Sequence, residues 1–154
     1  FEEIKNFTGP VQARNLEIFR ELLDKNHMLD QAHDFFRASG ALTAIEYKDV
    51  IEAQLRTYLK GGFQLLSLND FTGHGYAPVG ILDPFWNTKG LITPEKWREF
   101  CAPTVALLRF DKRALYNDEV FEGKAEIYNY GPTLLKNKKI NNCAYLLTYY
   151  RPFI

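Results

Sequence analysis

Apolar residues recur three and four positions apart through the first part of the chain, the spacing that places them on one face of an α-helix. This pattern predicts helices over residues 10–26, 29–38, 47–60 and 93–102. Ser39-Gly40 and Gly61-Gly62 are expected to end the second and third helices, because glycine readily adopts the left-handed backbone found at helix ends. Pro103 should end the fourth helix, since proline cannot continue the hydrogen-bond ladder.

Residues 63–68 follow a different pattern. They form a mostly apolar run without polar alternation, which is typical of a short strand covered on both faces, as in a parallel α/β sheet. Helices before and after this run fit the same fold class. One parallel strand cannot form a sheet by itself, so these residues predict a part of an α/β domain.

Beyond residue 103 the pattern indicates strands only. The predicted strands cover residues 105–110, 114–116, 120–128 and 140–150, with turn signals between them. Short strands at this spacing predict the opening of a β-sandwich. We therefore expect part of an α/β domain over 1–102 and part of an all-β domain over 103–154. Because neither part is complete, the rest of a parent chain or a homo-oligomer should be needed to complete the fold.

A carboxamide and a carboxylate stand where the predicted strand meets a glycine-rich loop. Asp70 could accept hydrogen bonds from two sugar hydroxyls, and Asn69 offers both a donor and an acceptor. In α/β barrels the carboxyl ends of the strands handle ligands, which favours a sugar-binding role for both residues. The structural alternatives for Asp70 are a turn cap for the loop or an ion pair with a nearby arginine.

Aromatic residues of the same loop are further candidates, since the C–H face of a sugar stacks on an aromatic ring. Phe71 and Tyr76 are predicted substrate-binding residues, and His74, between two glycines, is a candidate ligand contact. Phe85 and Trp86 are also available, although bulky rings at this place could simply fill a domain junction.

The composition of the chain limits the classes of ligand and partner that we expect it to bind. Lys plus Arg equals Asp plus Glu, 19 each, so no overall charge favours nucleic acid or an anionic membrane surface. The sequence contains no apolar run of membrane-spanning length and no Cys/His spacing of a zinc site, and its two cysteines read as buried free thiols. No dinucleotide or phosphate-loop motif occurs. We expect no metal and no cofactor, and a glycan or glycoside as the ligand.

Nine segments of the chain together resemble a bacterial branch of glycoside hydrolase family 2, which contains β-galactosidases, β-mannosidases and β-glucuronidases. They are GGFQLL at 61–66, NDF at 69–71, GHG at 73–75, VGILDPFW at 79–86, FEEIKNFTG at 1–9, NLEIF at 15–19, DQAHDFF at 30–36, ASG at 38–40 and TPEKWREFCAPTV at 93–105. The segments span most of the chain, so the resemblance is more specific than one short motif. It departs from the branch at two positions, where we expect His in place of Asn69 and Gln in place of His74, and this leaves the identity of the sugar open.

The resemblance implies both a fold and an activity. It implies the last part of a (β/α)8 TIM barrel, including its eighth strand, followed by the first strands of an immunoglobulin-like β-sandwich. Family members are retaining exo-β-glycosidases that use two glutamates about 5–5.5 Å apart. Both glutamates are expected upstream of Phe1, so this chain should hold no catalytic residue. Glu2 and Glu3 are no substitute, because adjacent side chains point in different directions.

The sequence thus predicts a fragment of a retaining glycosidase that is inactive alone. A second interpretation is a glycan-binding or assembly protein of the same architecture without turnover, and the residues upstream of Phe1 would decide between the two. A third is an independent interaction domain, which would be a stable, cooperative monomer. The family resemblance implies a periplasmic or extracellular location, and the residues themselves leave the location open.

Overall fold

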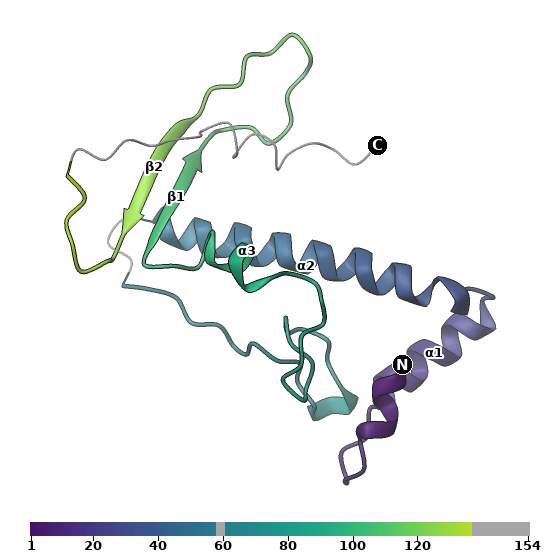
Figure 1. Ribbon diagram of the computed structural model, residues 1–154. Helices are drawn as coiled ribbons and strands as arrows, with labels where there is room; N and C mark the ends of the chain where they lie inside the picture. The colour runs from purple at the N-terminus through teal and green to yellow at the C-terminus, as the bar shows by residue number, and fades with distance from the viewer. Residues whose placement is uncertain (58–60, 137–154) are drawn as a thin grey trace. The chain divides into compact units, whose positions relative to one another are not determined.

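The computed structural model of the protein describes residues 1–57 and 61–136 (Figure 1). Within these residues it contains three α-helices, three short 3-10 helices and a two-stranded sheet. In chain order the elements are η1 (Glu2–Asn6), α1 (Arg14–Lys25), η2 (Leu29–Gln31), α2 (Ala32–Leu55), η3 (Gly73–Gly75), α3 (Pro94–Arg98), β1 (Thr104–Arg109) and β2 (Lys124–Asn129).

The chain divides into two compact units. The first comprises Phe1–Asp49 and Phe63–Pro94, and the second comprises the described residues of Val50–Gly62 and Glu95–Ile154. The predicted domains 1–102 and 103–154 remain a prediction for the intact protein.

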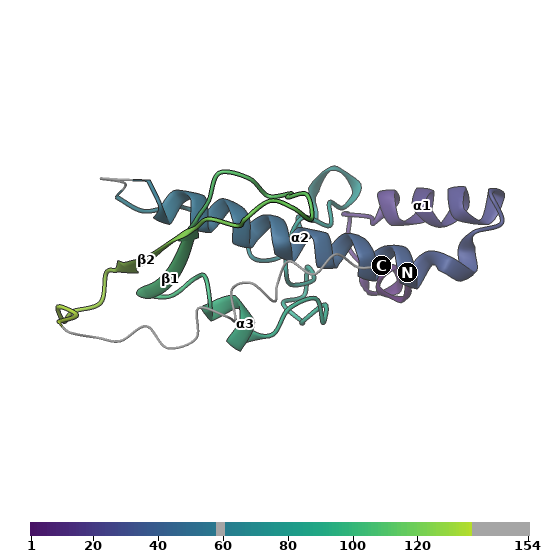
Figure 2. The same cartoon turned by 90° about the horizontal axis from the view of Figure 1, so that it is seen from above.

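In the first unit, the chain turns at η2 between α1 and the beginning of α2, and the two helices diverge from that turn (Figure 1, Figure 2). The predicted end of a helix at Ser39-Gly40 is wrong, because α2 runs through both residues without a break. The Ser39 hydroxyl donates to the Phe35 carbonyl oxygen at 2.8 Å, within the helix. A Cβ on Gly40 would lie 2.2 Å from the Leu91 side chain. Gly40 therefore permits the close approach of Leu91 and does not end the helix.

The barrel prediction is also wrong. Residues 63–68 form no strand, and the loop that follows holds only isolated bridges such as the parallel pair Asn69 and Leu82. Leu66 is 99% exposed, although the predicted strand would be buried on both faces. A buried parallel strand needs strand partners on each side for its backbone groups, and the described residues supply none.

In the second unit, β1 and β2 pair antiparallel over six residues each, with Ala106 opposite Ile127 (Figure 1). Val105 and Leu107 alternate with more exposed neighbours on β1 and are 1% and 2% exposed. They belong to the buried apolar set of this unit, together with Ile51 and Phe100. The strand predicted at 105–110 is therefore confirmed with a shift of one residue.

The immunoglobulin-like sandwich is a further wrong prediction for the part of the chain that is described. The strand predicted over 120–128 is observed only as β2, residues 114–116 form no strand, and 140–150 lie outside the described residues. A sandwich needs two packed sheets, whereas the described residues have one sheet of two strands. The sequence pattern located β1 and the second half of the strand predicted over 120–128, but periodicity alone does not supply the second sheet.

Candidate functional site

Asp70 is the centre of a buried polar cluster in the loop of the first unit. Its side chain is 0% exposed. Oδ1 accepts hydrogen bonds from the Gly80 backbone N–H at 2.7 Å and from Lys89 Nζ at 2.9 Å. Oδ2 accepts from the Tyr76 hydroxyl at 2.5 Å and from Lys89 Nζ at 3.0 Å. The carboxylate therefore has protein donors on both oxygens and holds together three points of the loop.

Lys89 supplies the charge that Asp70 requires. Its side chain is 5% exposed, and its ammonium also donates to the Gly80 carbonyl oxygen at 2.8 Å. An ion pair removed from water in this way is tolerated only when the remaining donors and acceptors are also satisfied, as they are here. Sequence reasoning anticipated an ion pair for Asp70 but named an arginine. Lys89 follows Asp70 by 19 positions, a separation that gives no local spacing by which the partner could be identified.

Tyr76 adopts an unusual backbone conformation, with φ of 87°. Left-handed values are rare for a bulky residue and persist only where other contacts impose them. One such contact is Asn15 of α1, whose Nδ2 donates to the carbonyl oxygens of Tyr76 at 2.8 Å and His74 at 3.1 Å. The other is the hydroxyl bond to Asp70. The loop is thus fixed from the helix side and from the buried cluster.

Burial, reinforced by the hydrogen bond to the Asp70 carboxylate, raises the pKa of Tyr76 well above its ordinary value of 10.0. A group whose pKa is higher in the folded than in the unfolded state stabilises the fold below the unfolded value. This contribution is lost as the pH rises above about 10. We therefore expect the stability of the wild type to fall more steeply above this pH than that of Tyr76→Phe.

Denaturant unfolding at a series of alkaline pH values, with phenolate absorbance as a second readout, tests this expectation. Tyr128 must be accounted for, because burial and its hydrogen bond to Tyr130 raise the pKa of Tyr128 to about 12. Tyr128→Phe is therefore the matched control. Identical pH dependence in the wild type and Tyr76→Phe would contradict the buried hydroxyl bond.

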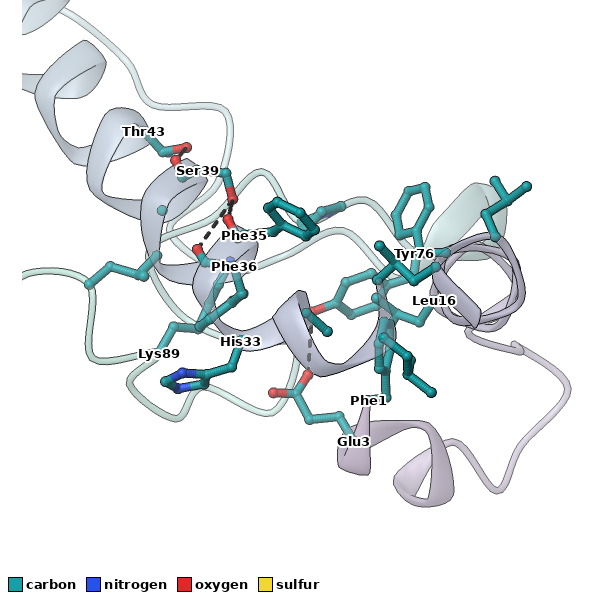
Figure 3. A pocket seen from close by; sticks show the side chains of 18 of the residues that line it. Phe1, Glu3, Leu16, His33, Phe35, Phe36, Ser39, Thr43, Tyr76 and Lys89 are labelled. Atoms are coloured by element: carbon teal, nitrogen blue, oxygen red, sulfur yellow. Dashed lines mark hydrogen bonds between the residues drawn. The ribbon is translucent and has the colours of Figure 1, made fainter. Parts of the chain in front are cut away.

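A pocket of about 900 Å³ lies in the first unit, beside this cluster. Residues of α1 and α2 form more than half of its lining, and Tyr76, Gly80 and Lys89 contribute a wall from the loop. Figure 3 shows the Tyr76 hydroxyl directed toward Glu3, whose Oε2 lies 3.4 Å away. Pockets of this size with few polar groups, one of them with a strongly shifted pKa, are characteristic of ligand sites.

The five predicted site residues take different places. Tyr76 lines the pocket, and Asp70 supports it from within the protein. The Asn69 side chain is used locally, accepting from the Ser67 hydroxyl at 2.5 Å and donating to the Asp70 carbonyl oxygen at 3.1 Å. Phe71 is 50% exposed, and its ring centroid lies 5.7 Å from that of His74.

The other two aromatic candidates, Phe85 and Trp86, lie in different surroundings. Phe85 packs edge-to-face on Phe7, with ring centroids 5.4 Å apart, whereas Trp86 is 66% exposed. Sequence reasoning missed Lys89, Asn15 and the pocket role of Glu3. Each of these acts across a long sequence separation, which residue spacing does not report.

No set of three or more His, Cys, Asp or Glu side chains in residues 1–57 and 61–136 is arranged to hold a metal ion. No helix in the same residues is both long enough and apolar enough to cross a membrane.

Comparison with known proteins adds no family assignment. No protein-family model matches the chain, and no curated protein matches it.

Proposed function

We propose that this chain is part of a retaining exo-β-glycosidase of the family 2 type, in which it takes part in recognising the glycoside and supplies no catalytic carboxylate. The observation that carries the proposal is the set of nine dispersed segments that resemble one branch of that family, from FEEIKNFTG at 1–9 to TPEKWREFCAPTV at 93–105. The proposal rests on these segments and not on the fold, because the described residues contain no barrel.

The loop geometry supports a division of work among the predicted site residues. Phe71 presents a half-exposed ring beside His74, which suits stacking on the C–H face of a sugar. Asp70 is buried and bonded on both oxygens, so it acts by holding the loop in place. Its role in glycoside recognition is then to position Phe71, its neighbour in the chain, and Tyr76.

A glycan-binding protein without turnover is the second candidate function. It has the same recognition residues and differs from the first only in the catalytic glutamates, for which this chain offers no candidate pair. A Glu-ending strand encoded shortly upstream of Phe1 would favour the glycosidase, and other residues there would favour the binder.

Binding and turnover are tested separately. We expect aryl β-galactosides, β-mannosides or β-glucuronides to bind the chain weakly and to release no aryl alcohol. Phe71→Ala should weaken binding about threefold to tenfold, the loss expected for one aromatic contact. Binding is measured by ligand-observed NMR and turnover by absorbance of the released aryl alcohol.

Tyr116→Ala is the matched control, since Tyr116 is a 78% exposed aromatic residue of the other unit. Equal affinity in Phe71→Ala and Tyr116→Ala would overturn the recognition role of the loop. Release of aryl alcohol that persists after removal of traces of other glycosidases would overturn the assignment of catalysis to residues outside this chain.

A further inference from the structure

The polar end of the pocket has more acceptors than donors. The Tyr76 hydroxyl carries one hydrogen and lies 2.5 Å from Asp70 Oδ2 but 3.4 Å from Glu3 Oε2. The shorter contact takes the hydrogen, because it is the better hydrogen bond. Glu3 then faces a phenolic oxygen that has only lone pairs left to offer. A donor placed between Glu3 and Tyr76 would satisfy both oxygens.

The charges of the pocket lining favour a cation as the hydrogen-bond donor between Glu3 and Tyr76. Glu3 and Asp30 line the pocket, and among the described residues neither has a basic side chain as an ion-pair partner. Lys89 also lines it, but its ammonium is bonded to Asp70 and Gly80 and its charge is thereby matched. His33 also contributes to the lining. The unmatched charge of the pocket is therefore negative.

The apolar walls of the pocket favour a ligand whose remaining part is apolar. Phe19, Phe35 and Phe36 line the pocket and are 45%, 41% and 41% exposed, so their surfaces are open to a ligand. Leu16 and Leu91 also contribute apolar surface to the lining. Aromatic rings also attract cations through their faces, which adds to the preference set by the two carboxylates.

We propose that this pocket binds a primary ammonium compound with an aromatic or branched apolar body. The ammonium donates to Glu3 Oε2 and to the Tyr76 hydroxyl oxygen, and the body lies against the phenylalanines of α1 and α2. A primary ammonium fits better than a quaternary one, because it has the N–H donors that the two oxygens lack. This site shares Tyr76 with the glycoside proposal but does not depend on that proposal, which is tested at the exposed ring of Phe71.

Three probes of nearly equal size test the proposal on the 154-residue chain: 2-phenylethylammonium, 2-phenylethanol and phenylacetate. Affinities are measured by calorimetry or by NMR shift changes at pH 8 and low salt. We expect the ammonium to bind about fivefold more tightly than the alcohol and the carboxylate to bind least. Added salt should reduce the advantage of the ammonium.

The variant Glu3→Gln should remove most of that advantage while leaving the alcohol unaffected. Glu2→Gln is the matched control, because Glu2 is adjacent, highly exposed, paired with Lys5 and outside the pocket lining. Equal affinity for the three probes, or loss of the advantage in Glu2→Gln as well, would overturn the site. Concentration-dependent dimerisation that excludes the ammonium would overturn it too, since a second copy of the chain would then be the occupant.

Discussion

Replacing Lys89 with methionine should lower the free energy of unfolding by about 3–5 kcal/mol, the cost of leaving a buried charge without its partner. Asp70 is 0% exposed and keeps its other donors, Tyr76 and Gly80, in the variant, but neither brings a positive charge. Methionine preserves most of the side-chain volume, so the loss reports the charge and not a cavity. Denaturant unfolding measures the change.

Two further variants make the Lys89 prediction specific. Lys5→Met removes an exposed ion pair with Glu2 and should change stability little, because exposed pairs contribute little. Adding Asp70→Asn to Lys89→Met removes the orphaned charge and should recover part of the loss, as a double-mutant cycle measures. Faster hydrogen exchange at the Gly80 amide would place the effect in the loop. A Lys89→Met variant as stable as Lys5→Met would contradict the buried pair.

The sequence predicted local structure better than architecture. The repeat of apolar residues in α1 and the mostly apolar run of β1, bounded by turn signals, arise from neighbouring residues, and both elements are observed close to their predicted positions. The strand at 63–68 was predicted from apolar character alone, which cannot report whether partner strands are present. That missing information accounts for the wrong strand at 63–68 and for the missing second sheet, whereas the barrel was implied by the family resemblance, which does not report partner strands either.

Two glycines, Gly40 and Gly75, show the same limit of prediction from the sequence. Ser39-Gly40 resembles a helix end, yet α2 continues through it, and the glycine leaves room for Leu91, 51 residues after Gly40, to pack where a Cβ would stand. At Gly75 the left-handed conformation is present, with φ of 80°, beside the strained Tyr76. One glycine is required by a neighbour far along the chain and the other by the local backbone, and the sequence alone does not distinguish them.

The candidate site, too, was predicted from the sequence only in part. The loop of residues 69–80 was predicted as the centre of the site, and its residues do form the Asp70 cluster and one wall of the pocket. The direct sugar contact proposed for Asp70 was inferred from its position after an apolar run, and position does not report burial. Lys89 and Asn15 could be identified only once the chain was folded, because their bonds to the loop depend on tertiary structure.

The second large effect is expected at Gly80, where alanine should lower the free energy of unfolding by about 3 kcal/mol. A Cβ there would lie 2.3 Å from the Asn69 carbonyl carbon and 2.5 Å from the Asp70 backbone nitrogen. Both atoms belong to the backbone, so no side-chain rotation relieves the clash. The loop must move instead, and the bond from Gly80 N–H to Asp70 must lengthen. Thermal or denaturant unfolding measures the loss.

Gly9→Ala is the matched control for Gly80→Ala. No heavy atom lies within 4 Å of the Cβ position at Gly9, and its backbone is outside the left-handed region. Alanine at such a position should be neutral or stabilise by about 0.4–1 kcal/mol, because it restricts the unfolded chain. If Gly80→Ala is as stable as Gly9→Ala, the loop does not pass as close to Gly80 as the structure has it. The placement of Tyr76 and Lys89 beside the pocket would then fail with it, because both bond to the carboxylate that Gly80 holds.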